Sequence, residues 1–282
     1  MTTHRAKKSL GQNFLVDANQ QRRIVAALEA GSGDTVIEIG PGQGALTRHI
    51  AGSVARLFLV ELDRDLAPAL ENEFADDPAV TVIQADVLDT DLREMVGGDM
   101  SSVKVVGNIP YNITTPIIFR LLERELRPER IVIMIQREVA DRILAGPGES
   151  EYGALSVGVQ SVARAERLFN VGRGSFRPVP RVDSTVLLIR PISPPPLTAR
   201  DEEDLRDLTR TVFSWRRKQL QKTLRSAPAY ALDSARVDAV QQQTGIALDR
   251  RPEQLAPDQF ISLARALRDN REAANHTSPR AP

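Results

Sequence analysis

Short apolar runs alternate with helix-like segments through the first half of this chain of 282 residues. The runs are almost continuously apolar, which is typical of strands buried on both faces of a sheet. The segments between them have apolar residues at helical spacing. This alternation predicts an α/β fold with a mostly parallel, doubly wound sheet and right-handed crossovers. The predicted strands are residues 36–39, 57–62, 80–85, 103–107 and 131–136, and the predicted helices are 45–51, 66–74, 115–126 and 138–144.

The pattern changes after a further helix at 154–163 and two closing strands at 166–171 and 184–190. Prolines then interrupt the chain, and we expect a stiff linker there because proline cannot continue a sheet. Helical patterns follow at 204–213, 217–224, 234–243 and 257–267. The domains expected are a basic N-terminal arm at 1–22, a sheet domain at 23–191, a Pro-rich linker at 192–197, a small all-α domain at 198–269 and a disordered tail at 270–282.

The composition excludes several kinds of site. The chain has no cysteine, which rules out disulfides, thiol catalysis and zinc sites built on cysteine. Its histidines, His4, His49 and His276, are too scattered to form a metal-ligand pattern, so we expect no metal, with an all-carboxylate Mg²⁺ site as the alternative. No apolar stretch approaches a membrane span, and the polar start lacks the apolar middle of a signal peptide. The default expectation is a cytoplasmic protein without membrane contact.

The net charge is zero, with 37 basic and 37 acidic residues, but the charges are segregated. The only charged side chains of residues 210–225 are basic, and residues 164–181 carry arginines against a single acid, Glu166. Clusters of this kind could present a basic face to a nucleic acid from a neutral chain. The alternative is a set of solvated helix faces whose charges are unrelated.

A glycine-rich turn follows the first predicted strand, in the segment Glu38-Ile-Gly40-Pro-Gly42-Gln-Gly44. Glycines there permit a tight turn and a close approach of the backbone to a ligand. The dinucleotide-binding fingerprint is G-x-G-x-x-G, whereas here the third glycine comes one residue early. The E-x-G-x-G-x-G form is similar to that of S-adenosylmethionine (SAM) methyltransferases, which have no pyrophosphate to hold. We therefore expect a Rossmann-like sheet of the class I SAM-dependent methyltransferases.

An acid follows each of the next two strands. Glu61 lies at the end of the second strand, about twenty residues beyond Gly40, where a carboxylate can bind ribose hydroxyls. Asp86 follows the third strand, where an acid can accept a hydrogen bond from an adenine amine. Either acid alone would be interpreted as a solvated loop residue. Together with the glycine turn they converge on the carboxyl edge of one sheet, where such folds bind ligands.

The segment Asn108-Ile109-Pro110-Tyr111 follows the fourth strand and suits methyl transfer to an exocyclic amine. The Asn108 side-chain oxygen and the Ile109 carbonyl could accept the two N–H groups of an adenine amine, which would leave its lone pair free to attack. Pro110 would stiffen the turn through its fixed φ, and the Tyr111 ring could stack on a base swung out of its helix. The alternative is an ordinary Asn/Pro turn after a strand.

Phe176 begins the segment Phe176-Arg-Pro178-Val-Pro180 ahead of the last strand. The rigid positions would fix its ring without a helix or a ladder, and a ring facing Tyr111 could clamp the same base. The alternative places Phe176 in the core, with prolines that merely end a strand.

Four motifs, in their order and spacing, resemble one family. They are Gly11-Gln-Asn-Phe-Leu15, the glycine turn, NIPYNITTP from Asn108 and FRPVPRVDS from Phe176. From about residue 5 to about residue 267, the chain resembles the small-subunit ribosomal RNA adenine dimethyltransferases of the KsgA type. Each motif is moderately specific, and their conjunction is highly specific. The basic FSWRRKQL segment from Phe213 also looks like the C-terminal helix of this family.

The resemblance implies SAM-dependent dimethylation of N6 on two adjacent adenines near the 3′ end of small-subunit (16S) rRNA. The substrate would be the late, immature 30S particle, with a role in ribosome small-subunit biogenesis, and we expect a monomer. The expected catalytic residues are Asn108, Ile109, Pro110, Tyr111 and Phe176. The expected cofactor-binding residues are Asn13, Leu15, Gly40, Gly42, Glu61, Asp86 and Asn108, the first two by resemblance alone. The expected RNA-binding residues are Arg5, Lys7, Lys8, Arg177, Arg181, Arg216, Arg217 and Lys218.

Three other interpretations stay open. A methylase of large-subunit RNA shares the fold and the Asn-Ile-Pro-Tyr turn, although relatives of that kind tend to be more basic overall. A DNA adenine methylase also swings out its target base, but nothing here resembles a sequence-reading domain. A non-catalytic assembly factor could keep the pocket for binding alone, which intact Asn108, Tyr111 and Phe176 argue against.

Overall fold

The computed structural model of the chain describes residues 6–7 and 10–277, with side chains as far as 272. The chain folds into two compact units. Unit 1 comprises Met1–Ala140 and Ala163–Pro191, and unit 2 comprises Asp141–Val162 and Ile192–Pro282. The sheet domain expected at 23–191 therefore differs from unit 1, because residues 141–162 pack with the C-terminal helices instead.

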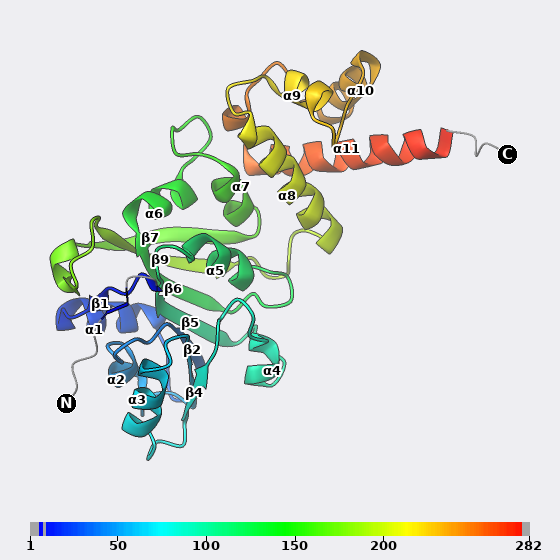
Figure 1. Cartoon of the computed structure of the whole chain (residues 1–282). Helices are drawn as coiled ribbons and strands as arrows, with labels where there is room; N and C mark the ends of the chain where they lie inside the picture. Colours follow the sequence, from blue (N-terminus) through cyan, green and yellow to red (C-terminus); the bar gives the residue numbers. More distant parts are fainter. Residues whose placement is uncertain (1–5, 8–9, 278–282) are drawn as a thin grey trace. The chain divides into compact units, whose positions relative to one another are not determined.

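A mostly parallel sheet forms the centre of unit 1 (Figure 1). Among the described residues its strand order is β4-β3-β2-β5-β6-β9-β7. Neighbours from β4 to β6 pair in parallel, while β9 is antiparallel to both β6 and β7. This topology confirms the predicted fold class. The strands are β2 (Thr35–Ile39), β3 (Arg56–Glu61), β4 (Val80–Gln84), β5 (Val103–Asn108), β6 (Arg130–Gln136), β7 (Ala163–Val171) and β9 (Ser184–Pro191).

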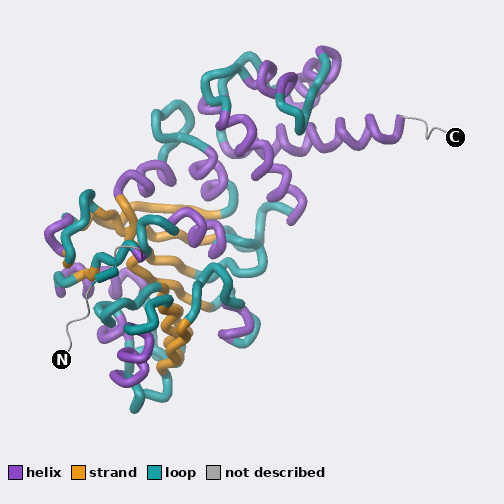
Figure 2. Tube along the Cα trace, in the orientation of Figure 1, coloured by secondary structure: helices purple, strands orange, loops and turns teal. Residues whose placement is uncertain are grey.

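Helices connect the strands of unit 1 (Figure 2). They are α1 (Ala18–Leu28), α2 (Thr47–Ile50), α3 (Leu66–Glu73), α4 (Leu92–Val96), α5 (Thr114–Leu121) and α6 (Arg137–Leu144), of which α6 ends in unit 2. A small antiparallel ribbon pairs β1 (Phe14–Leu15) with β8 (Phe176–Arg177), which follows the 3₁₀ turn η2 (Arg173–Ser175).

Helix α1 lies partly in the segment expected to be an arm. Asp17 caps it, because its side chain accepts hydrogen bonds from the N–H groups of Asn19 and Gln20. The helix buries Ile24 and Leu28, which are one turn apart. The polar first half of the helix hides this periodicity in the sequence.

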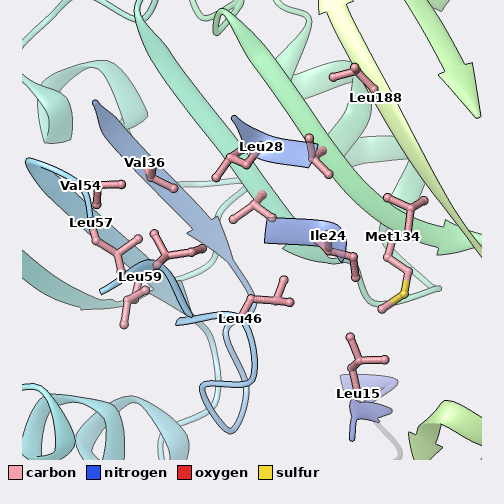
Figure 3. Close-up of a cluster of buried hydrophobic side chains, with 14 of the residues drawn as sticks. Leu15, Ile24, Leu28, Val36, Leu46, Val54, Leu57, Leu59, Met134 and Leu188 are labelled. Atoms are coloured by element: carbon pink, nitrogen blue, oxygen red, sulfur yellow. The ribbon is translucent and has the colours of Figure 1, made fainter. Parts of the chain in front are cut away.

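The core of unit 1 includes one face of the sheet together with α1 (Figure 3). Ile24 and Leu28 join a cluster with Val36 of β2, Leu59 of β3 and Met134 of β6. Successive strand residues point to opposite faces of a sheet. The strand residues between these positions are also mostly buried, so both faces of the central strands are covered. This explains the near-continuous apolar runs in the sequence.

Unit 2 is helical. Thr198 and Asp201 form a capping box at the start of α8, and Asp201 also binds Arg265 and Arg268 of α11. Helix α11 extends to Thr277, so part of the tail expected to be disordered is helical, and the rest of that tail lies outside the described residues. The helices of unit 2 are α7 (Ala154–Gln160), α8 (Ala199–Ser214), α9 (Leu220–Ser226), α10 (Ser234–Thr244), the 3₁₀ turn η3 (Pro252–Gln254) and α11 (Pro257–Thr277).

Candidate active site

A pocket lies at the carboxyl ends of the parallel strands in unit 1. Gly40 follows β2, Leu62 follows β3, Asp86 lies just beyond β4 and Asn108 ends β5, and all four line the pocket. Parallel strands bring their carboxyl ends to one edge, and open α/β sheets bind ligands there. The structure therefore brings together the residues that the motifs placed at separate strand ends.

The turn after β2 requires glycine at two positions. Gly40 and Gly42 have φ of +64° and +59°, in the left-handed region that strains other residues. A Cβ on Gly42 would also lie 3.1 Å from two ring carbons of Phe14. Any side chain at this position would displace Phe14, which itself lines the pocket.

Glu61 is held by two backbone donors at the end of β3. Its Oε2 accepts a hydrogen bond from the Gly42 N–H at 2.9 Å, and its Oε1 accepts one from the Asp63 N–H at 2.8 Å. Burial raises the pKa of Glu61, although these hydrogen bonds oppose the shift. The carboxylate is therefore fixed in one orientation at the pocket wall.

Two further acids line the pocket. The Oδ1 of half-buried Asp86 accepts a hydrogen bond from the Leu88 N–H at 2.9 Å. Glu38, the first residue of the glycine motif, is 1% exposed, and its Oε2 accepts a hydrogen bond from Thr47 Oγ1 at 2.8 Å. Burial raises the pKa of Glu38 to about 7. A carboxyl in this setting becomes easier to ionise when a cation binds beside it.

The side-chain amide of Asn108 has a defined orientation. Its Nδ2 donates a hydrogen bond to the Asn13 carbonyl at 2.9 Å, so Oδ1 is the acceptor that remains. The Ile109 N–H donates to the Met134 carbonyl at 3.1 Å, whereas no donor among the described residues pairs with the Ile109 carbonyl. The turn therefore has two acceptors on consecutive residues, Oδ1 of Asn108 and the Ile109 carbonyl.

Tyr111 is hydrogen-bonded to Ser184, the last residue of the motif that begins at Phe176. Its Oη lies 2.9 Å from Oγ of Ser184, the first residue of β9, and Ser184 is fully buried. Burial raises the pKa of the Tyr111 phenol. The ring itself is half-buried and lines the pocket.

Phe176 is not part of the pocket wall. It is 0% exposed and belongs to the hydrophobic core, with Leu15 directly opposite it in the β1–β8 ribbon. The predicted stacking position facing Tyr111 is therefore wrong for this conformation. The alternative interpretation, a core ring, is the correct one, because pairing with the N-terminal segment covers Phe176.

The charge of the pocket lining is one-sided. Glu38, Glu61 and Asp86 line it, whereas no Lys, Arg or His among the described residues does. Such a wall repels a pyrophosphate and attracts a cation. Carboxylates also suit ribose hydroxyls. SAM carries a sulfonium and a ribose, so the residues present fit this cofactor.

Residues 3–269 match the family model described as Ribosomal RNA adenine dimethylase. The chain belongs to the ribosomal RNA adenine dimethylase family. Two relatives named Ribosomal RNA small subunit methyltransferase A are each 44% identical to it. The relative from Geobacter sulfurreducens aligns over 93% of this chain and 95% of its own, and that from Pseudomonas putida over 96% and 98%. The family resemblance inferred from the four motifs is confirmed.

Solved structures agree with this assignment. A dimethyladenosine transferase from Plasmodium falciparum superposes with a TM-score of 0.77 at 25% identity, covering 92% of this chain and 98% of that one. The 23S rRNA methyltransferase ErmE superposes with a TM-score of 0.66 at 28% identity, covering 91% and 100%. The dimethylase family uses SAM, which confirms the predicted cofactor, and the chain is a SAM-dependent rRNA adenine dimethyltransferase.

The N-terminal motif of this dimethylase takes part in the pocket. Asn13 and Leu15 both line it, and Leu15 is 4% exposed in β1. From the residues alone this segment would be a flexible basic arm. Its pairing with β8 instead orders it beside the pocket.

The predicted RNA-binding residues near the N-terminus fall into two groups. Arg5 and Lys8 lie outside the described residues. Lys7 is described, and its Nζ lies 2.6 Å from Asp63 Oδ1 and 2.7 Å from Asp65 Oδ2. Two carboxylates therefore hold this ammonium, and its contact with RNA stays a prediction.

The other predicted RNA-binding residues are on the surface. Arg177 and Arg181 are exposed in unit 1, as are Arg217 and Lys218 in unit 2. Arg216 is half-buried and donates a hydrogen bond to the Glu149 carbonyl at 3.2 Å, within unit 2. The geometry therefore leaves four of these cations accessible to a phosphate.

Three residues of the site were not assigned a role from the sequence. Gln12 and Phe14 line the pocket, and Ser184 lies beside Tyr111. All three lie within the motifs that carry the family resemblance, but a motif alone does not show which contacts its members make. The burial of Glu38 did have a signal, because this acid lies within an otherwise apolar run.

The described residues hold neither a metal-ligand group nor a helix that could cross a membrane. In that part of the chain, no group of three or more His, Cys, Asp or Glu residues could hold a metal ion. Within the same residues, no helix has both the length and the apolar character that crossing a membrane requires.

Proposed function

We propose that this enzyme dimethylates N6 of two adjacent adenines near the 3′ end of small-subunit (16S) rRNA in the late, immature 30S particle. Identity of 44% to proteins named Ribosomal RNA small subunit methyltransferase A, over nearly the whole of both chains, supports this choice of RNA. The modification would contribute to small-subunit biogenesis in the cytoplasm, with the enzyme acting as a monomer.

The hydrogen bond from Asn108 to the Asn13 carbonyl carries the mechanism. It fixes the orientation of the amide and leaves Oδ1 of Asn108 as its acceptor, and the Ile109 carbonyl is the second acceptor of the turn. These two oxygens would each accept one N–H of the adenine amine, which favours a pyramidal nitrogen with an exposed lone pair. Bound SAM supplies an electrophilic methyl group on its sulfonium. Orientation of the amine is then the main contribution of the turn.

Proton removal would need no strong base. The attacked amine becomes acidic as it gains the methyl group, and its proton can pass to solvent. Tyr111 would support the base by stacking, and Pro110 would keep the turn rigid. In the second methylation the amine has only one N–H left. The position that the other N–H occupied in the first methylation must then accept the methyl group already transferred.

The pocket acids would hold the cofactor. Glu61 would bind the ribose hydroxyls, because its carboxylate is fixed by two N–H donors. Asp86 would accept a hydrogen bond from the adenine amine of the cofactor. The backbone of the Gly40–Gly42 turn, together with Asn13 and Leu15, would enclose the remainder.

RNA would bind to basic surfaces on each unit. In unit 1 the exposed side chains are Arg177 and Arg181. In unit 2, Arg217 and Lys218 line a hollow together with Lys222 and Arg251, against the acids Asp249 and Glu253. This excess of cations suits the phosphate backbone.

The test is methyl transfer to isolated particles. Unmodified small subunits, naked large-subunit RNA and duplex DNA are each incubated with the enzyme and labelled SAM, and the modified adenines are mapped by mass spectrometry. We expect two adjacent dimethylated adenines near the 3′ end in the small subunit and no label elsewhere. Label in large-subunit RNA alone would instead support an activity like that of ErmE, whose structure is similar.

A further inference from the structure

The N-terminal strap is defined here as Lys7 and residues 10–15, and its residues 10–15 form one wall of the pocket at the carboxyl edge of the sheet. It contacts three strand ends in turn. Lys7 binds Asp63, just beyond β3, at 2.6 Å. Further along, the Asn13 carbonyl accepts from Asn108 at the end of β5, and the Phe14 ring packs on Gly42, beyond β2.

Asp63 holds the strap through both of its carboxylate oxygens. Oδ1 accepts from Lys7 Nζ and Oδ2 accepts from Gln12 Nε2, each at 2.6 Å. The backbone N–H of Lys7 donates to Gln12 Oε1 at 2.7 Å, which closes the three residues into one hydrogen-bonded group. The Asp63 side chain is 0% exposed. It has no role in the methyl-transfer mechanism proposed above.

The burial of Asp63 favours the position in which the strap lies against the pocket. Burial alone would raise the pKa of Asp63, but the Lys7 ammonium, the Asp65 N–H and Gln12 together hold that pKa below its ordinary value. Lifting the strap would break the ion pair between Lys7 and a buried carboxylate, which is strongly unfavourable. The strap is therefore held against the pocket whenever Lys7 is in place.

The anchor is connected to the reacting group through the chain between them. Gln12 precedes Asn13, whose carbonyl accepts from Asn108 Nδ2 at 2.9 Å, and the Asn13 side chain donates to the Gly11 carbonyl at 3.1 Å. Gly11 itself has φ of +64°, so the strap turns sharply between its two anchoring residues, Lys7 and Gln12. A strap that shifts would release the hydrogen bond that fixes the orientation of the Asn108 amide.

We infer that Asp63 is a positioning residue for methyl transfer: by anchoring Lys7 and Gln12 it closes the strap over the cofactor pocket and orients the Asn108 amide. This inference rests on the role proposed above for Asn108. It gives Lys7 the role of anchoring the strap to Asp63 in place of the expected RNA contact.

Two variants of the full-length chain test it. Asp63→Ala removes the anchor, and Lys7→Met removes the cation from a partly exposed site where misfolding is not expected. Cofactor binding is measured by calorimetry, and kcat and KM are measured on small subunits at saturating SAM. We expect each variant to weaken cofactor binding about tenfold and to lower kcat at saturating cofactor about tenfold, because charged hydrogen bonds are lost. The Lys7→Arg variant should retain most of the wild-type cofactor affinity and kcat.

The matched control is Arg190→Met, which also removes a surface cation of unit 1, one paired with Glu166 at 2.9 Å. It should leave cofactor binding and kcat within about twofold of wild type. A second control, Asp65→Asn, removes the other carboxylate near Lys7 but leaves both Asp63 contacts, and should also have little effect.

Three results would overturn the inference. Wild-type cofactor affinity and kcat in Lys7→Met would show that the anchor is dispensable. A higher KM for small subunits with unchanged cofactor affinity would make Lys7 an RNA contact instead. If Arg190→Met lost as much cofactor affinity and kcat as Lys7→Met, the effect would come from the net charge of the protein and not from the anchor. If the wild-type enzyme fails to methylate small subunits, the proposed function falls, while the calorimetric series still tests the strap.

Discussion

The hydroxyl oxygens of Tyr111 and Ser184 lie 2.9 Å apart, although 73 positions separate the two residues in the chain. Ser184 is fully buried at the start of β9, whereas Tyr111 is half-buried at the pocket. The bond therefore ties a ring that lines the pocket to a buried strand of the sheet. It also joins the Asn-Ile-Pro-Tyr turn to the motif that begins at Phe176.

The first prediction concerns this bond. Ser184→Ala and Tyr111→Phe should each lower kcat about fivefold, because each removes one neutral hydrogen bond that fixes the ring. The double variant should be no worse than either single variant, since both remove the same interaction. Single-turnover rates at saturating SAM measure this. Additive losses would mean that the two hydroxyls act independently.

The second prediction concerns Asn108. Asn108→Ala should lower methyl transfer by about a thousandfold, because it removes one of the two acceptors proposed to hold the amine in the transition state. Cofactor affinity should fall only in part, since the other pocket residues remain. Transfer of label and calorimetric SAM binding separate the two effects. An active Asn108→Ala enzyme would refute the assignment.

The third prediction concerns Glu38 and pH. Its pKa is raised to about 7 by burial, so the cofactor-free fold binds the proton more tightly than the unfolded chain does. The stability that Glu38 contributes is therefore fully present below the unfolded value and is lost as pH rises through about 7. Glu38→Gln keeps an acceptor for Thr47 and removes this dependence.

The measurement for Glu38 is urea unfolding of the cofactor-free protein at several pH values. At pH 8, Glu38→Gln should be more stable than wild type by about 3 kcal/mol, and the gap should narrow steadily towards pH 5. A gap that does not change with pH would show that Glu38 titrates normally.

The sequence predicted those parts of the site that depend on strand ends. Gly40, Glu61, Asp86 and Asn108 follow or end apolar runs, and a parallel sheet must bring such positions to one edge. Boundaries of the central strands agreed within a residue or two for the same reason, because burial on both faces makes each run apolar from end to end.

The sequence could not predict contacts made by very short elements. β1 and β8 have two residues each, which is too short for any periodicity, and their pairing covers Phe176 with Leu15. The contact between Lys7 and Asp63 could not be predicted either, because the two residues are 56 positions apart and no local pattern links them. A basic residue near a basic terminus was therefore interpreted as an RNA contact.

The fourth prediction concerns Asp201, which ties α8 to α11 within unit 2. It is 5% exposed, and its carboxylate accepts hydrogen bonds from Arg265 at 2.8 Å and from Arg268 at 3.0 Å. Asp201→Ala should lower the free energy of unfolding by about 2 to 3 kcal/mol, because it leaves both guanidinium groups without this partner. Glu203→Ala, an exposed acid of the same helix, is the control and should change stability by less than about 0.5 kcal/mol.

The fifth prediction concerns the basic hollow of unit 2. Arg217 and Lys218 are exposed there, and each phosphate contact adds about one to the slope of log affinity against log salt concentration. The double variant Arg217→Ala/Lys218→Ala should therefore weaken binding to small subunits and reduce that slope by about two, while SAM affinity stays at the wild-type value. The matched control is Arg206→Ala/Arg236→Ala, which removes two exposed cations of unit 2 that do not line the hollow. If both double variants reduce the slope equally, RNA responds to the total charge of unit 2. A larger change in the first variant alone places phosphates at the hollow.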